Sequence, residues 1–187
     1  MSQLAWENLT VSAETKVLHR CCGRGQTKRF LVQYFHHVTG LDASPLSLQG
    51  ATKNVPSANY YLEAFAESMP FPHCQFDRST QQRCDARNAT GAIATIFQEV
   101  YRAIKSGGLF ILVDFHLPIN PVLLPGLAVF LWLFETETAW KYIETDLGSL
   151  LAEVGWRSYN SEEERQPKLY AGGNIQVIQL QKSYQIR

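Results

Sequence analysis

The chain has 187 residues, 45% of them hydrophobic, and its 17 lysines and arginines balance its 17 aspartates and glutamates. This is enough apolar material for one ordinary core and too little for two full domains, so a single domain over residues 1–187 is expected. The balanced charge excludes a basic surface of the kind that holds a nucleic-acid backbone. We therefore expect no nucleic-acid partner.

The sequence gives no sign of export or of a membrane span. Residues 1–15 lack a basic start, an apolar core and a small-residue cleavage site, so we interpret them as an N-terminal extension and not as a signal peptide. The longest apolar stretch, residues 122–134, is interrupted by Pro125-Gly126. It is too short to span a bilayer, although peripheral contact with a membrane would suit it. A cytoplasmic protein is expected.

The four cysteines, Cys21, Cys22, Cys74 and Cys84, show no Cys-x-x-Cys spacing. The adjacent pair is poorly placed for a relaxed disulfide or for metal ligation. Reduced thiols and no metal site are therefore expected.

The first structured unit combines an apolar run from residue 16, a Gly-x-Gly turn and an amphipathic helix over residues 26–35. A second apolar run then ends at Asp42. A β-loop-α-β unit of this kind holds a nucleoside, because Gly23 and Gly25 let the backbone approach the ligand. Asp42 is placed to accept hydrogen bonds from the two ribose hydroxyls. The neighbouring residues Cys21 and Ala43 complete the predicted cofactor site.

This turn lacks the patterns of two other kinds of nucleotide site. A dinucleotide fingerprint requires a third glycine where Lys28 stands, and a P-loop requires Gly-Lys-Ser/Thr at the end of a longer loop. Neither pattern is present, so the spacing favours a single nucleoside.

Strands and helices alternate through most of the remaining chain. Ser44-Pro45 indicates the start of a helix that ends near residues 54–56, and a short strand is expected over residues 59–64. Apolar residues recur at helical spacing over residues 93–104, before a stop at Ser106-Gly107-Gly108. Residues 109–113 then predict a buried strand. It delivers Asp114 and His116, our candidate catalytic residues, to the edge of the sheet where ligands bind.

The C-terminal part predicts one more helix and a hairpin. Thr145-Asp146 is expected to cap the helix, and Gly155 to end it. Strands over residues 168–171 and 174–181 are expected to pair around Gly172-Gly173.

In this order, the motifs between about residues 17 and 182 resemble class I S-adenosylmethionine-dependent methyltransferases, in particular ubiquinone/menaquinone-biosynthesis-like methyltransferase domains. The resemblance is carried by the glycine turn with Asp42, by Ala66-Glu67-Ser68-Met69-Pro70-Phe71, by Phe76-Asp77 and by Ile104-Lys105-Ser106-Gly107-Gly108. It implies an α/β, Rossmann-like fold with a mostly parallel seven-stranded sheet, helices on both faces and an antiparallel C-terminal hairpin strand. It also implies S-adenosylmethionine as cofactor and methyl transfer to a small acceptor.

The resemblance further implies roles for particular segments. Ala66 and Glu67 would contact the adenine, with Glu67 meeting its amino group. Phe76-Asp77 would open the fourth strand, beside the first in the middle of the sheet. Residues 117–143 would form an inserted cap over the acceptor site, and their Trp, Phe and Leu content favours an apolar or aromatic acceptor.

The chain departs from the family at two places. His19 and Arg20 stand where the family has an acid and an aliphatic residue, and the acid helps to fix the amino end of the cofactor's methionine moiety. Arg20 is expected either to reach solvent or to disturb the first strand. Residues 78–88 are polar where a central strand should be apolar. A very short strand followed by a loop, a defective sheet and a locally altered coding sequence are three open explanations.

These departures favour an alternative hypothesis, a catalytically silent relative that keeps the fold as a binding or scaffolding module. A third hypothesis, a nucleotide-dependent oxidoreductase, would need the missing third glycine.

Overall fold

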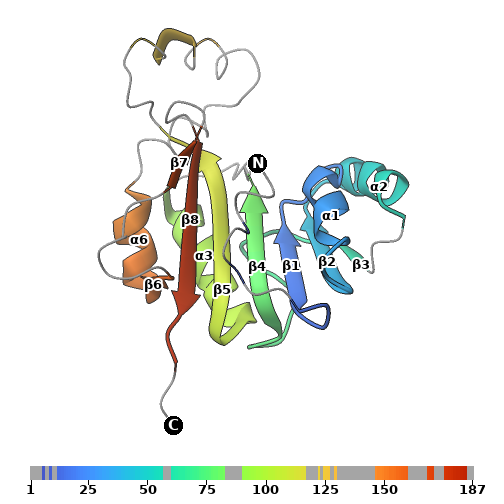
Figure 1. Cartoon of the computed structure of the whole chain (residues 1–187), viewed down its shortest axis with the longest axis horizontal. Helices are drawn as coiled ribbons and strands as arrows, with labels where there is room; N and C mark the ends of the chain where they lie inside the picture. Colours follow the sequence, from blue (N-terminus) through green and yellow to red (C-terminus); the bar gives the residue numbers. More distant parts are fainter. Residues whose placement is uncertain are drawn as a thin grey trace.

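The computed structural model describes residues 6, 9, 12–56, 60–82, 90–116, 122, 124–126, 129, 146–159, 168–170 and 175–184. In chain order its elements are β1 (Lys16–Arg20), α1 (Gln26–Leu31), β2 (His37–Asp42), α2 (Pro45–Asn54), β3 (Tyr60–Glu63), β4 (Phe76–Gln82), α3 (Thr90–Ala103), β5 (Ile104–Phe115), α6 (Leu147–Val154), β6 (Trp156–Ser158), β7 (Lys168–Tyr170) and β8 (Ile175–Lys182). The strands form one 8-stranded sheet in the order β3-β2-β1-β4-β5-β8-β6, and β7 pairs with β8 outside this path (Figure 1).

The pairings confirm the predicted α/β, Rossmann-like architecture. The pairs β1–β2, β1–β4, β2–β3 and β4–β5 are parallel. β8 pairs antiparallel with β5, β6 and β7, as expected of a C-terminal hairpin strand. The sequence did not predict β6, because a three-residue strand directly after a helix is too short to show periodicity.

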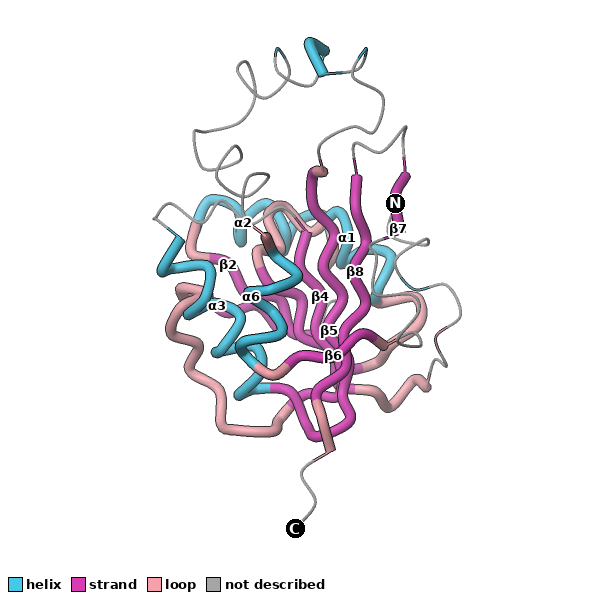
Figure 2. The backbone as a smooth tube through the Cα atoms, turned by 90° about the vertical axis from the view of Figure 1, so that its left-hand side faces the viewer, coloured by secondary structure: helices cyan, strands magenta, loops and turns pink. Residues whose placement is uncertain are grey.

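Helices cover both faces of the sheet. α3 and α6 contact each other and pack on the face that carries Leu18 and Phe110 (Figure 2). On the other face, Leu31 of α1 belongs to a second apolar cluster with Val17 and Ile111. Consecutive residues of β1 therefore point into different cores, as the strand period requires.

Helix α1 begins where the sequence predicts but is shorter than the expected 26–35. It ends at Leu31. The Val32 N–H still bonds to the Lys28 carbonyl four residues back, but the N–H groups of Gln33 and Tyr34 bond three residues back, to Phe30 and Leu31. This spacing is tighter than that of an α-helix.

The caps of two other helices agree with the sequence. Ser44 Oγ accepts the Ser47 N–H at 3.3 Å, and Pro45 occupies the first turn of α2. Asp146 accepts the Ser149 N–H at 3.1 Å at the start of α6, which ends at Gly155 with a φ of 104°.

The structure of β4 excludes two of the three explanations for its polar sequence. It runs over seven residues and pairs with β1 on one side and β5 on the other. The explanations by a very short strand and by a defective sheet are therefore wrong. Residues 83–88 of the polar segment lie outside the described residues.

Arg20 is fully buried, yet β1 keeps a regular register with both of its neighbours. Its guanidinium donates to Gln81 Oε1 on β4 and lies 5.3 Å from the centroid of the Phe110 ring. The expectation that Arg20 would reach solvent or disturb the strand is wrong, because β4 supplies a polar partner at the paired position.

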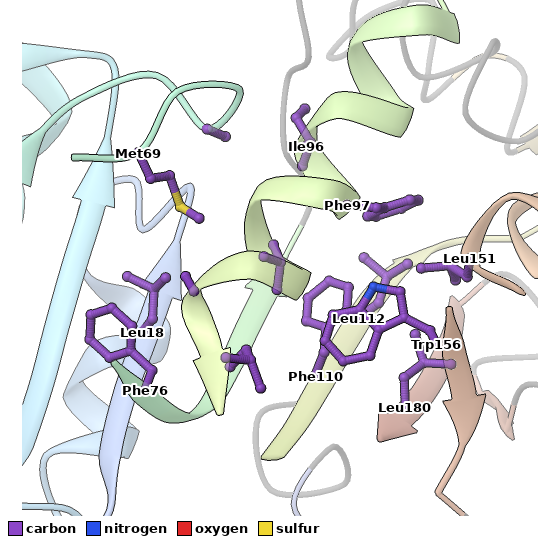
Figure 3. Close-up of a cluster of buried hydrophobic side chains, with 14 of the residues drawn as sticks. Leu18, Met69, Phe76, Ile96, Phe97, Phe110, Leu112, Leu151, Trp156 and Leu180 are labelled. Atoms are coloured by element: carbon purple, nitrogen blue, oxygen red, sulfur yellow. The ribbon is translucent and has the colours of Figure 1, made fainter. Parts of the chain in front are cut away.

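The main core lies between the sheet and α3. The aromatic rings of Phe97, Phe110 and Trp156 meet there, with centroids 6.1 Å and 5.4 Å apart (Figure 3). Met69 reaches the same core from the segment that follows β3.

Candidate functional site

The predicted site residues follow the carboxyl ends of parallel strands. The glycine loop follows β1, Asp42 ends β2, Ala66 and Glu67 come after β3, and His116 comes directly after β5. Because the strands are parallel, these ends lie along one edge of the sheet, where open α/β sheets bind ligands.

Asp42 holds three segments of this edge together. Its Oδ2 accepts the Gly23 N–H at 2.8 Å, and its Oδ1 accepts the Ser44 N–H at 3.0 Å. Its backbone carbonyl accepts the Ala64 N–H at 3.1 Å. The carboxylate thus fixes the glycine loop against the start of α2, and Ala43 lies exposed between these two anchors.

The glycine loop has the backbone that its sequence predicts. Gly23 and Gly25 have φ angles of 51° and 83°. A Cβ at Gly25 would lie 3.2 Å from Ala51 Cα in α2, whereas a Cβ at Gly23 would meet nothing within 4 Å. Gly25 therefore serves the packing of two helices, and Gly23 leaves open space beside the loop.

Cys21 shares this left-handed conformation, with a φ of 49°, although it carries a side chain. It is disulfide-bonded, so the expectation of reduced thiols is wrong at this residue. Cys22 and Cys74 are free. Burial, followed by the nearby Asp42 carboxylate, raises the pKa of the Cys22 thiol to about 12.

A buried lysine underneath the loop was not predicted as part of the site. Lys28 Nζ donates to the Tyr60 carbonyl at 2.6 Å and lies 3.6 Å from the centroid of the Tyr61 ring. Burial lowers its pKa to about 8. A Cβ at Gly40 would come within 3.1 Å of Nζ, so Gly40 on β2 makes room for the ammonium group. The sequence alone did not indicate that Lys28 is buried.

The segment that carries Ala66 and Glu67 lies against α3. Ala66 and Met69 are buried in the main core, and Glu67 between them is half-buried. Glu99 and Arg102 of α3 bond to the main chain of this segment. Sequence reasoning missed these two residues, although their i,i+3 spacing on a helix is typical of a salt bridge.

The two candidate catalytic residues come from β5, which β4 separates from β1. Asp114 is buried opposite Gln176 of β8, and His116 is half-buried just beyond the strand. They lie at the predicted edge of the sheet. Strands β1 and β4 separate them from Asp42, which ends β2.

His19 stands where the resemblance implies an acid, and its side chain cannot carry a negative charge. It is buried on β1, and burial, followed by the charge of Lys28, lowers its pKa to about 3. Its Nδ1 has no hydrogen-bond partner among the described residues. The imidazole is therefore neutral at physiological pH.

The described part of the chain offers neither a metal site nor a membrane-spanning helix. It contains no group of three or more His, Cys, Asp or Glu side chains placed to hold a metal ion. It also contains no helix long and apolar enough to cross a bilayer.

Comparisons with known proteins agree with this geometry. Residues 17–108 match the family described as a methyltransferase domain. A relative from Synechocystis sp., described as an uncharacterized methyltransferase, is 45% identical over 177 residues, which cover 95% of this chain and 80% of the relative.

Solved structures share the fold. The YcgJ protein of Bacillus subtilis has a TM-score of 0.63 at 21% identity, with 98% of each chain covered. A SAM-dependent methyltransferase of Methanosarcina mazei has a TM-score of 0.67 at 19% identity, with 94% of this chain and 95% of that chain covered. The solved structures show that the chain shares its fold with a SAM-dependent methyltransferase. From the identity to the Synechocystis relative, together with the family match, we conclude that the chain belongs to the methyltransferase family.

Proposed function

We propose that this protein transfers a methyl group from S-adenosylmethionine to a small, apolar or aromatic acceptor. The observation that carries the proposal is the Asp42 carboxylate, which holds the glycine loop and still has acceptor capacity. A carboxylate offers about four acceptor sites, and the bonds from Gly23 and Ser44 occupy two of them. The remaining lone pairs suit the two hydroxyls of a ribose.

The surroundings of Asp42 also fit a nucleoside. The open space beside Gly23 admits a ligand against the backbone of the loop. Cys21, Gly25 and Ala43 complete the cofactor-binding set on this side, and Ala66 and Glu67 contact the adenine on the other. In this assignment Glu67 accepts a hydrogen bond from the adenine amino group.

The cofactor would supply a methyl group bound to a positively charged sulfur, which is open to attack by a nucleophile. The protein contributes positioning and exclusion of water. We assign His116 and Asp114 to the acceptor side. In that reaction a ring nitrogen of His116 would accept the proton that the acceptor heteroatom loses on methylation. Asp114 helps to hold the acceptor in place.

The acceptor class rests on the segment that follows His116. Residues 117–143 form the proposed cap, and the described apolar side chains of Val122, Leu124 and Val129 are 78%, 41% and 55% exposed. Such side chains suit an apolar acceptor or the surface of a membrane. We therefore propose that the cap meets its acceptor in solution or at a lipid surface. We further propose that the enzyme is a cytoplasmic, single-domain protein.

A catalytically silent binding protein is the second candidate. The observation that favours it is His19, which is buried and neutral where the family carries a negative charge. A site without that charge attracts the cofactor's ammonium group less strongly.

Isothermal calorimetry with S-adenosylhomocysteine, NAD and ATP tests the proposal. We expect S-adenosylhomocysteine to bind and to raise the melting temperature, because a ligand of the folded state stabilises it. Asp42→Asn should weaken binding by roughly 1.5–3 kcal/mol, the range for hydrogen bonds to a charged group. Glu63→Gln, at the paired position of β3, is the matched control. Preferential binding of NAD would contradict the assignment, and binding without methyl transfer to quinol-like acceptors would favour the silent protein.

A further inference from the structure

The segment that follows β3 is anchored by α3 as well as by its own apolar residues. Glu99 Oε2 accepts the Met69 N–H at 2.8 Å. Arg102 donates from Nη2 to the Met69 carbonyl at 2.9 Å and from Nη1 to the Phe71 carbonyl at 2.6 Å. Two side chains from one helical turn thus satisfy both backbone groups of Met69 and one of Phe71.

The two side chains also hold each other. Arg102 Nε donates to Glu99 Oε1 at 2.7 Å, and its Nη2 donates to Glu99 Oε2 at 2.9 Å. Such a two-point contact fixes direction as well as distance. The side chain of Glu99 is 18% exposed and that of Arg102 is 23% exposed, so solvent only partly screens the pair. The hydrogen bond from Arg102 is the main reason why the pKa of Glu99 lies below its usual range.

This anchor lies immediately beside the residues assigned to the adenine. Ala66 and Met69 are buried in the same core, so the main chain between them is fixed at both ends. Glu67 lies within this short span. Its distance from an adenine at the edge of the sheet therefore depends on where α3 holds Met69.

We propose that Glu99 and Arg102 are positioning residues for adenine recognition, and that they act through the main chain of Met69 and Phe71 without touching the ligand. This inference rests on the proposed function. It extends the cofactor site to a helix on one face of the sheet, which contributes no residue to the predicted binding set.

The test compares two ligands that differ only in the base, S-adenosylhomocysteine and S-inosylhomocysteine. The base of S-inosylhomocysteine, hypoxanthine, has a carbonyl where adenine has its amino group. A site built around that amino group therefore rejects S-inosylhomocysteine. Arg102→Lys keeps the charge but cannot reach both carbonyls and Glu99 together. We expect it to weaken S-adenosylhomocysteine binding roughly tenfold and S-inosylhomocysteine binding much less, so that base selectivity falls.

The matched control is Asp77→Asn at the opposite edge of the sheet. Asp77 also accepts one side-chain and one backbone donor, from Lys105 Nζ at 2.7 Å and from the Lys16 N–H at 2.9 Å. Asp77→Asn should leave the selectivity between the two ligands unchanged. Glu99→Gln, which keeps the shape of the side chain, provides a milder second variant should Arg102→Lys fail to fold.

A double variant separates positioning from general stability. If Arg102 acts through Glu67, Arg102→Lys should have little further effect on selectivity in a Glu67→Ala background. The inference is overturned if Arg102→Lys weakens both ligands equally, or if its effect is unchanged in that background. Failure of the parent protein to bind S-adenosylhomocysteine would instead refute the proposed function.

Discussion

β4 and β5 lie side by side in the middle of the sheet and are built from opposite kinds of residue. β5 carries a continuous apolar run from Leu109 to Val113, as expected for a strand covered on both faces. Ser79, Thr80 and Gln81 of β4 are buried to the same extent. After a register shift between Phe76 and Arg78, the two strands nevertheless pair in continuous parallel register from Arg78 to Gln82.

The difference teaches that a polar central strand depends on what its neighbour offers. β1 pairs His19 with Thr80 and Arg20 with Gln81, so the two places where the chain departs from the family lie next to each other. The Arg20 guanidinium uses Gln81 as an acceptor. Burial of these groups therefore costs less than the composition of each strand suggests when it is considered alone.

The largest expected effect contrasts two paired positions, Phe110 on β5 and Ser79 on β4. Phe110→Ala should lower the free energy of unfolding by about 3–5 kcal/mol, because it opens a cavity beneath Phe97 and Trp156. Ser79→Ala should be neutral or stabilising, since the buried Ser79 Oγ has no hydrogen-bond partner among the described residues. Urea unfolding measures both variants. Equal losses would show that β4 is not the more tolerant strand.

The next effect concerns the pair that joins β1 to β4. Gln81→Leu removes an acceptor of the buried Arg20 guanidinium and should cost roughly 1.5–3 kcal/mol of stability. Arg20→Leu should cost a comparable amount because it removes the donor. The double variant should lose less than the two single losses together, since well-packed apolar residues often replace a buried polar pair without penalty. Additive losses in this cycle would show that the two residues do not stabilise each other.

The contrast between the strands also explains which parts of the fold could be predicted. The apolar run predicted the centre of β5, and the caps predicted α2 and α6, because these features act locally along the chain. β5 begins earlier than expected, at Ile104, so the predicted helix stop at Ser106-Gly107-Gly108 lies within the strand. The route of β4 could not be predicted, since its tolerance for Gln81 depends on Arg20, 61 residues earlier. The end of α1 was placed too late for a similar reason, because periodicity does not report a tightening of the last turn.

The candidate site divides in the same way. The arrangement of Asp42, Gly23 and Gly25 follows from spacing, because the glycine turn and the acid belong to one β-loop-α-β unit. Lys28 could not be identified from its position in the sequence alone, since its burial requires the space that Gly40 leaves on β2. Arg102 also remained hidden, because its partners in the segment after β3 become neighbours only when α3 packs.

The smallest expected effect is a pH dependence that arises from His19 of β1. Burial lowers its pKa to about 3, whereas an unfolded chain holds the imidazole near pKa 6.5. The unfolded state therefore binds a proton first as the pH falls, and the stability present above pH 6.5 is lost between pH 6.5 and pH 3. From pH 7 to pH 5 this residue alone should lower the free energy of unfolding by about 2 kcal/mol.

His19→Asn should remove that part of the slope, while His37→Asn, at an exposed position of β2, serves as the control for removing an imidazole. Urea unfolding of the three proteins at both pH values measures the slopes. If His19→Asn loses as much stability as the parent between pH 7 and pH 5, the imidazole takes up its proton in the folded protein, and the polar contact between β1 and β4 is open to water.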